Sequence, residues 1–126
     1  MFIFHFCFAA TATSKAVAHA YFFDVGQGYC FFFVTTDKRV AVLIDAGSAK
    51  CPKYNVLMDN EINANSRAEA IANEIKEHID GSTKMLVIAT HGDIDHYSWL
   101  GKIVNGLSAK LLLLIGGVSS DYQDDT

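Results

Sequence analysis

Segments typical of strands alternate with segments typical of helices through most of this sequence. Residues 40–44, 84–90 and 110–115 are short apolar stretches, as buried strands usually are. Helical patterns cover 66–79 and about 95–105, in the intervals between those stretches. Because strands that alternate with helices form parallel or mixed sheets with helices packed on them, this order predicts an α/β fold.

The stretch 66–79 has the clearest helical pattern. Ser66 is expected to cap the helix, with Glu69 three residues later as in a capping box, and Gly81 follows the expected end. The preceding residues, 48–65, carry few periodic signals and are expected to form a long connecting loop. The residues expected on the buried face of the helix are Ala68, Ile71, Ala72 and Ile75.

The amino-terminal part is rich in aromatic residues, since all nine phenylalanines lie at or before Phe33. Residues 20–23 and 30–36 are aromatic and β-branched, and Gly26-Gln27-Gly28 lies between them. This pattern predicts two strands, or one bent strand, across a glycine turn.

Residues 1–20 have two interpretations, an apolar leader or an extra strand. The apolar run 1–10 precedes Ala18-His19-Ala20, a pattern like a signal-peptidase site, which would imply secretion after cleavage near Ala20. Phenylalanine at alternate positions from Phe2 to Phe8 instead indicates a strand, and no basic residue precedes the run. We therefore favour the strand and a cytoplasmic protein. The run is too short for a membrane-spanning helix.

Residues 21–126 are expected to form one domain, because a chain of 126 residues has room for a single core. Its 51% apolar and 19% charged residues are typical of a globular protein. The net charge of −4 gives no general attraction to nucleic acid or anionic lipid, although a local patch could hold a nucleic-acid substrate. Cys7, Cys30 and Cys51 are too widely spaced for a zinc ribbon and are expected to be free thiols.

The densest group of reactive side chains follows the strand expected over 84–90. The sequence Thr90-His91-Gly92-Asp93-Ile94-Asp95-His96 holds two imidazoles and two carboxylates. These donors suit zinc, manganese or iron, and a glycine between them permits a tight turn that brings them together. Alternatively, Asp93 or Asp95 caps the next helix and the histidines are solvated. One cap needs one carboxylate and leaves both histidines unexplained, so we favour a metal site.

Three motifs, taken in their order and spacing, resemble one family. They are Phe-Asp-Val-Gly-Gln-Gly at 23–28, Leu-Ile-Asp-Ala-Gly at 43–47 and Ala-Thr-His-Gly-Asp-Ile-Asp-His at 89–96. The sequence from 21 to about 119 resembles the metallo-β-lactamase fold superfamily, specifically the branch that includes the hydrolase domain of ComEC-type competence proteins. The resemblance implies the first half of an αββα sandwich, in which a mixed sheet carries helices on one face.

The resemblance implies that His91, Asp95 and His96 are metal ligands. Asp93 stands where the family motif has a histidine, and is expected to bind the metal or to contact a ligand. Asp95 is also expected to be the catalytic residue, because it would orient a metal-bound hydroxide. The implied cofactor is a divalent metal, zinc or manganese, with two ions in the complete domain.

The resemblance also implies supporting roles for five residues. Asp45 looks like the family's acidic residue that orients the metal loop from behind the ligands, and a simple Asp-Ala-Gly turn explains it equally well. Asp24, in the first motif, is expected to support the site in the same way. Gly26, Gly28 and Gly47 are expected to let the chain turn tightly beside it.

The family's sandwich has a second half that supplies further ligands, and this sequence has no histidine after His96. We therefore expect an amino-terminal half that is inactive alone and that pairs with a missing carboxy-terminal half or with itself. The implied function is hydrolysis by metal-activated hydroxide, of a phosphodiester or nucleic-acid substrate rather than a lactam. The alternative is a non-catalytic binding or assembly module that keeps half of the fold.

Overall fold

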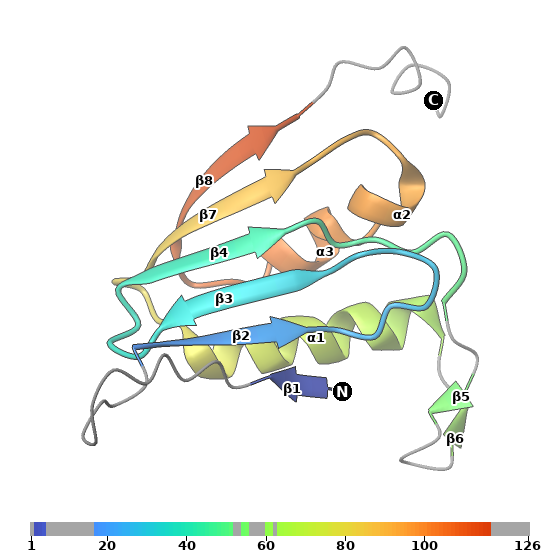
Figure 1. Cartoon of the computed structure of the whole chain (residues 1–126), viewed down its shortest axis with the longest axis horizontal. Coiled ribbons are helices and arrows are strands. Elements are labelled where there is room, and N and C mark those ends of the chain that lie inside the picture. The colour runs from blue at the N-terminus through green and yellow to red at the C-terminus, as the bar shows by residue number, and fades with distance from the viewer. Residues whose placement is uncertain (1, 5–16, 52–53, 56–59, 62, 117–126) are drawn as a thin grey trace.

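The computed structural model describes residues 2–4, 17–51, 54–55, 60–61 and 63–116. Its largest element is a six-stranded sheet with the strand order β1-β2-β3-β4-β7-β8 (Figure 1). These strands are β1 (Phe2–Phe4), β2 (Ala18–Phe22), β3 (Phe31–Thr35), β4 (Val40–Ile44), β7 (Lys84–Ala89) and β8 (Lys110–Ile115).

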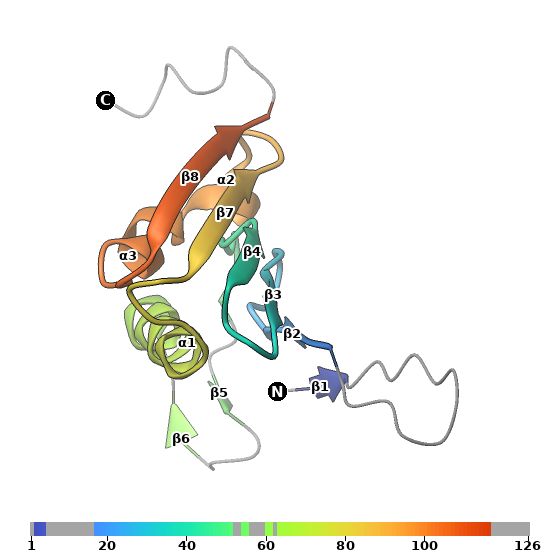
Figure 2. The same cartoon turned by 90° about the vertical axis from the view of Figure 1, so that its left-hand side faces the viewer.

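The sheet is mixed, and its helices lie on one face. Strands β1 to β4 pair antiparallel in sequence order, whereas β4, β7 and β8 are parallel. Parallel neighbours need crossover connections, and these carry the helices α1 (Ala64–His78), α2 (Ile94–Tyr97) and α3 (Leu100–Val104). Figure 2 shows α1 and α3 on the same side of the sheet. The α/β fold with a mixed sheet and helices on one face is confirmed.

The helix α1 begins earlier than the sequence pattern indicated. Asn63 is its cap: the Asn63 side chain accepts from the Ser66 backbone N–H at 2.9 Å, and Ser66 Oγ accepts from the Asn63 backbone N–H at 3.2 Å. The prediction of Ser66 as the cap is therefore wrong, because Ser66 is the reciprocal partner inside the first turn. Glu69 takes no part in the box and instead pairs with Lys102 of α3 at 3.1 Å. The predicted buried face is confirmed.

The single helix predicted over 95–105 is two short helices in the structure. The break falls at Trp99, whose backbone N–H donates to the Ala46 carbonyl at 2.9 Å. The Trp99 side chain is buried in the core. A contact with the loop after β4 thus separates α2 from α3, which helical periodicity alone does not reveal.

The loop predicted over 48–65 contains two short strands, so that prediction is wrong in part. Strands β5 (Tyr54–Asn55) and β6 (Asn60–Glu61) pair antiparallel as a separate small sheet. At the amino terminus, β1 supplies an edge strand, and residues 5–16 lie outside the described residues. In the part of the chain that the structure describes, no helix is long and apolar enough to cross a membrane.

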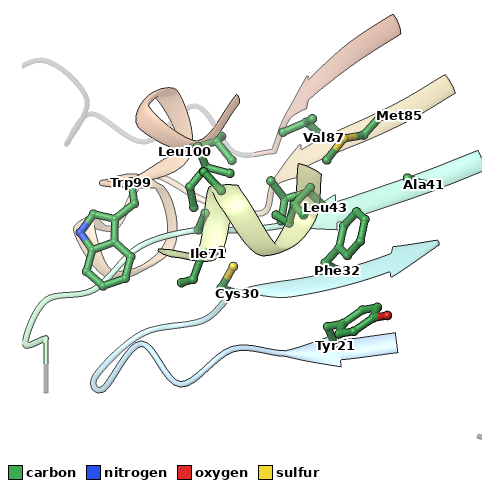
Figure 3. Packing of buried hydrophobic residues seen from close by; sticks show 14 of the residues in the cluster. Tyr21, Cys30, Phe32, Ala41, Leu43, Ile71, Met85, Val87, Trp99 and Leu100 are labelled. Atoms are coloured by element: carbon green, nitrogen blue, oxygen red, sulfur yellow. The ribbon is translucent and has the colours of Figure 1, made fainter. Parts of the chain in front are cut away.

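The core lies between the sheet and the helices. Phe32, Leu43 and Ile75 are completely buried, and Figure 3 shows the strand side chains meeting Ile71 of α1. Side chains at alternate positions point to the opposite face, where Phe31 and Phe33 are only partly covered. The sheet therefore has one face that the helices fill from β2 to β7 and one open apolar face, and the edge strand β8 is exposed along its whole length.

Candidate metal centre

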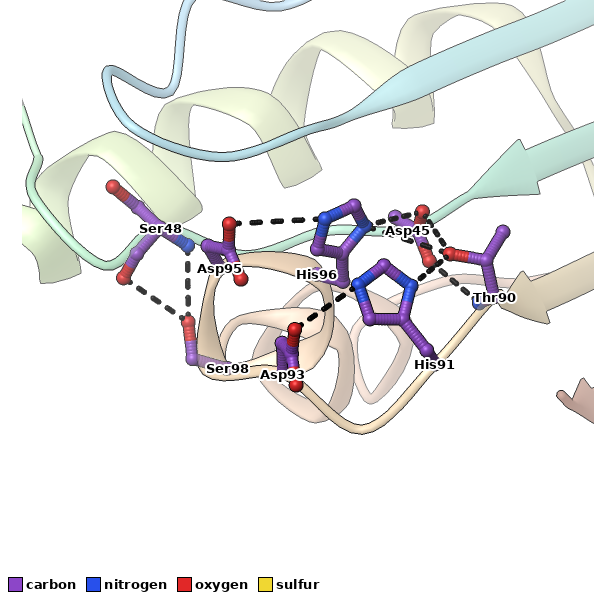
Figure 4. Close-up of polar contacts among 8 residues, drawn as sticks. All are labelled: Asp45, Ser48, Thr90, His91, Asp93, Asp95, His96 and Ser98. Carbon is purple, nitrogen blue, oxygen red and sulfur yellow. Dashed lines mark hydrogen bonds and ion pairs between the residues drawn. The ribbon is translucent and has the colours of Figure 1, made fainter. Parts of the chain in front are cut away.

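The histidine-rich motif lies where two parallel strands end. Asp45 directly follows β4, and Thr90 and His91 directly follow β7, the strand paired with β4. Asp95 and His96 belong to α2, the next element of the chain. Because parallel strands end at the same edge of a sheet, residues far apart in the sequence meet there (Figure 4).

Asp45 connects the members of this group through hydrogen bonds. Its side chain is buried, and its carboxylate accepts three hydrogen bonds: from the Thr90 backbone N–H at 2.7 Å, from the Thr90 hydroxyl at 2.7 Å and from His96 Nδ1 at 2.8 Å. Its backbone has a φ of 54°, in the left-handed region that aspartate tolerates. Three donors compensate the cost of burying this charge. Asp45 therefore forms part of the turn after β4 and also orients the His96 ring.

This network sets the orientation of both imidazoles. The Thr90 hydroxyl donates to Asp45, so its oxygen is free to accept from His91 Nδ1, which lies 2.9 Å away. His96 donates from Nδ1 to Asp45 directly. In the neutral tautomer that these two hydrogen bonds select, each ring has its proton on Nδ1 and a lone pair on Nε2. Figure 4 shows the Nε2 edges of the two rings turned toward the acidic side chains near α2.

Each Nε2 atom faces a carboxylate at a distance longer than a hydrogen bond. His91 Nε2 lies 3.4 Å from Asp93 Oδ2, and His96 Nε2 lies 3.7 Å from Asp95 Oδ2. A lone pair that faces a carboxylate is repelled unless a cation lies between them. Two ligands of tetrahedral zinc, with bonds of about 2.1 Å, are separated by about 3.4 Å. The donor types, and the spacing of the His91–Asp93 pair, are compatible with a divalent metal.

The cluster forms two pairs rather than one cage. The His91 and His96 rings are adjacent, with centroids 3.8 Å apart. Among the described residues, however, no group of three or more histidine, cysteine or acidic side chains is arranged so that it could hold a metal ion. The structure thus brings the four predicted ligands to one place but not into a complete coordination sphere.

The profile of the metallo-beta-lactamase superfamily matches residues 23–113, a span that includes all three motifs. The chain belongs to the metallo-beta-lactamase superfamily. Comparison with curated proteins and with solved structures gave no match. Members of this superfamily commonly bind divalent metals, and the membership supports a metal-dependent hydrolase in general terms.

Within this superfamily fold, the helix-cap interpretation of Asp93 does not hold. Asp93 occupies the position before α2 with an extended backbone, but its side chain makes no cap hydrogen bond. Its carboxylate, 61% exposed, faces His91 instead. A cap would require the side chain to turn back onto the backbone N–H groups of α2.

Gly28 and Gly47 of the superfamily motifs allow the start of α2 to pack closely against the loops of the first two motifs. A Cβ atom on Gly47 would lie 2.7 Å from the Ile94 carbonyl oxygen, and one on Gly28 would collide with the carbonyl oxygen of Gly47. Backbone hydrogen bonds close this contact, including Ala46 N–H to the His96 carbonyl at 2.7 Å. Gly26 is different, because its φ of 77° requires a glycine turn.

Asp24 lies apart from the histidines. Its carboxylate accepts from the Gly26 backbone N–H at 3.1 Å and pairs with Arg67 of α1 at 3.8 Å. These contacts join the first motif to α1. Thr90, to which the sequence analysis gave no role, bridges Asp45 and His91. Its only signal in the sequence was its position between a strand and the first histidine.

Proposed function

We propose that this chain is a metal-dependent hydrolase whose metal is held by His91, Asp93, Asp95 and His96. The observation that carries the proposal is the fixed orientation of both imidazoles, each bound through Nδ1 and each presenting Nε2 to a carboxylate. Histidines that bind metals commonly donate their other ring N–H to a carboxylate or another acceptor in this way. Asp45 and Thr90 would hold the two rings ready before a metal arrives.

Asp95 is the residue we assign to catalysis. Its side chain is 29% exposed, so it is accessible to water while it remains beside His96. A divalent metal bound in this cluster would supply a water whose pKa falls to about 7 and positive charge for the attacked centre. The Asp95 carboxylate would accept a hydrogen bond from that water and keep it oriented toward the substrate.

Zinc and manganese are both compatible with the donor set. The cluster offers two imidazole nitrogens and two carboxylates, and carboxylate in place of imidazole shifts the preference toward manganese. A second ion would need ligands beyond these four. We propose two ions for the complete domain, because a pair of metals can hold both the attacking and the leaving oxygen of a displacement.

For the substrate we propose a phosphodiester, following the resemblance to the ComEC-type branch. Aspartate at position 93 and the Asp24-to-Gly28 motif support this choice over lactam hydrolysis. The net charge of −4 opposes strong binding of a nucleic-acid backbone, so any such substrate needs recognition beyond charge.

The test is an assay of the longest form of the protein that its gene encodes, because we expect the 126 residues alone to turn over slowly. The substrates are single-stranded DNA, bis-nitrophenyl phosphate and a chromogenic cephalosporin, each with zinc or manganese. We expect hydrolysis of the phosphodiesters and its loss in Asp95→Asn. A matched control, Asp37→Asn, removes an exposed carboxylate that contacts Thr35 and should keep the activity. Activity on the cephalosporin alone would overturn the substrate assignment.

The second candidate is a non-catalytic binding or assembly module. The absence of a three-ligand group among the described residues favours it. Metal binding without hydrolysis of any of the three substrates would support this alternative over the enzyme.

A further inference from the structure

Tyr29 places an exposed aromatic ring next to the histidine pair. The residue is 40% exposed, and its ring lies nearly parallel to that of His96, with an angle of 16° and centroids 6.4 Å apart. The His91 ring lies on the same cluster, tilted by 45° to the His96 ring with centroids 3.8 Å apart. An exposed tyrosine is ordinary by itself, but one aligned with the His96 ring of a candidate catalytic site offers a flat surface beside that site.

Main-chain hydrogen bonds hold the backbone of position 29 in place. The Tyr29 N–H donates to the Asp95 carbonyl at 3.1 Å, and the Tyr29 carbonyl accepts from the Gly47 N–H at 3.3 Å. The residue before it, Gly28, has no room for a Cβ atom beneath α2. Position 29 is therefore fixed relative to Asp95 through the main chain, and a substitution of its side chain leaves these bonds intact.

We propose that Tyr29 is a positioning residue that stacks on an unpaired nucleobase of the substrate, an inference that rests on the proposed phosphodiester hydrolysis. An aromatic ring binds any base through its π-face and needs no net positive charge, which suits a protein with a net charge of −4. A base inside a duplex has no free face, so the substrate class is single-stranded nucleic acid. The stacked base would set the adjacent phosphodiester beside Asp95.

A cation on the neighbouring loop after β4 supports this choice. Lys50 is exposed, and its carbonyl accepts from the Gln27 N–H at 3.1 Å in an isolated β-bridge, so its backbone lies beside the loop that carries Tyr29. Proteins that bind single strands usually combine an aromatic platform with basic side chains along the path of the backbone. Lys50 would contact a neighbouring phosphate of the strand whose base lies on Tyr29.

The test compares binding of two probes in EDTA, where no metal supports cleavage. The probes are a fluorescent oligothymidylate and the same oligomer with abasic sites, and the readout is fluorescence anisotropy at low salt. We expect the wild-type protein to bind the oligothymidylate about tenfold more tightly than the abasic oligomer. Tyr29→Phe keeps the π-face and should keep this ratio. Tyr29→Leu keeps apolar volume without the π-face and should bring the ratio to about one.

A second readout separates positioning from a merely structural role. In the hydrolysis assay, Tyr29→Leu should raise KM for single-stranded DNA about tenfold and leave kcat for that substrate unchanged. KM for bis-methyl phosphate, which has no ring to stack, should also stay unchanged. The proposal would be overturned, even if hydrolysis is observed, if the wild-type protein bound both probes equally. It would also be overturned if Tyr29→Leu lowered the affinity for both probes by the same factor. Base-dependent binding that Tyr29→Leu abolishes would sustain it even if no phosphodiester is cleaved, and only the proposed function would then fail.

Discussion

At the scale of single residues, the chemistry of this site depends on Asp45 and Thr90 as much as on the histidines. The Asp45 carboxylate accepts hydrogen bonds from Thr90 and from His96. The Thr90 hydroxyl oxygen in turn accepts from His91 Nδ1 and so orients the His91 ring. Without these partners, each imidazole could turn or change its tautomer, and its Nε2 lone pair would no longer point toward a carboxylate. The residues behind the ligands therefore determine what the ligands can bind.

Thr90→Val should weaken metal binding by about tenfold, because loss of a partner behind a ligand typically costs that much. The substitution removes the hydroxyl that His91 Nδ1 contacts and keeps the shape of the side chain. The dissociation constant for zinc is measured by calorimetric titration. The control is Thr35→Val, which removes a hydroxyl bonded to Asp37, away from the site. Equal zinc affinity in the wild type and Thr90→Val would show that the network does not prepare the site.

Cys30 should be an unreactive thiol in the folded protein. Burial, with the nearby charge of Asp45, raises its pKa from 9.0 to about 12. In a Cys7→Ser/Cys51→Ser variant, the remaining thiol should react with a disulfide reagent only as fast as the protein unfolds. Above pH 9 an unfolded chain ionises this thiol whereas the folded chain does not, so the free energy of unfolding should fall as pH rises. Rapid labelling at neutral pH would contradict this burial.

At the scale of elements, the contact between α2 and the loops of the first two motifs decides the shape of the site. The carbonyls of Asp95 and His96 accept from Tyr29 and Ala46, and the two glycines beneath them leave no space for a side chain. This contact fixes a helix of four residues, too short to be stable alone, in one place.

Gly47→Ala should lower the free energy of unfolding by about 2 kcal/mol, since the added methyl group meets backbone atoms that cannot move aside. Chemical denaturation measures the change. Gly101→Ala in α3 is the matched control, because its Cβ meets nothing within 4 Å, and it should stabilise the protein by about 0.5–1 kcal/mol. Equal effects of the two substitutions would contradict the close packing at Gly47.

The elements were predictable from the sequence to the extent that their signals are local. The apolar stretches that became β4, β7 and β8 and the buried face of α1 follow from periodicity. The break at Trp99 depends on a carbonyl of the loop after β4, and the Asn63 cap depends on which of two capping residues the fold selects. The motif marked the four candidate ligands, but the role of Thr90 emerged only when β4 and β7 were paired.

At the scale of the whole molecule, the sheet carries an open apolar face. Leu112 and Leu114 of β8 are 61% and 49% exposed. In register with them, Leu86 and Ile88 of β7 continue the same face toward β4. Strands of a parallel sheet usually have both faces covered, so this face and the β8 edge have the character of a contact surface.

The isolated chain should therefore self-associate. Sedimentation velocity should show larger species as the protein concentration rises, and Leu112→Lys/Leu114→Lys should shift the distribution toward the monomer. The control is Lys84→Ala, which changes the surface charge but adds no charge to β8. This variant should self-associate like the wild type. A compact wild-type monomer at high concentration would contradict the expectation.

The most direct test of the central claim is the metal content of the purified chain. The protein is dialysed against zinc or manganese, freed of excess ion and submitted to elemental analysis. We predict bound metal in the wild type and its loss in His91→Ala/His96→Ala. The control, His19→Ala/His78→Ala, removes the same number of imidazoles away from the cluster, and circular dichroism verifies that all three proteins are folded. Equal metal content in the wild type and in His91→Ala/His96→Ala would contradict the assignment of the site.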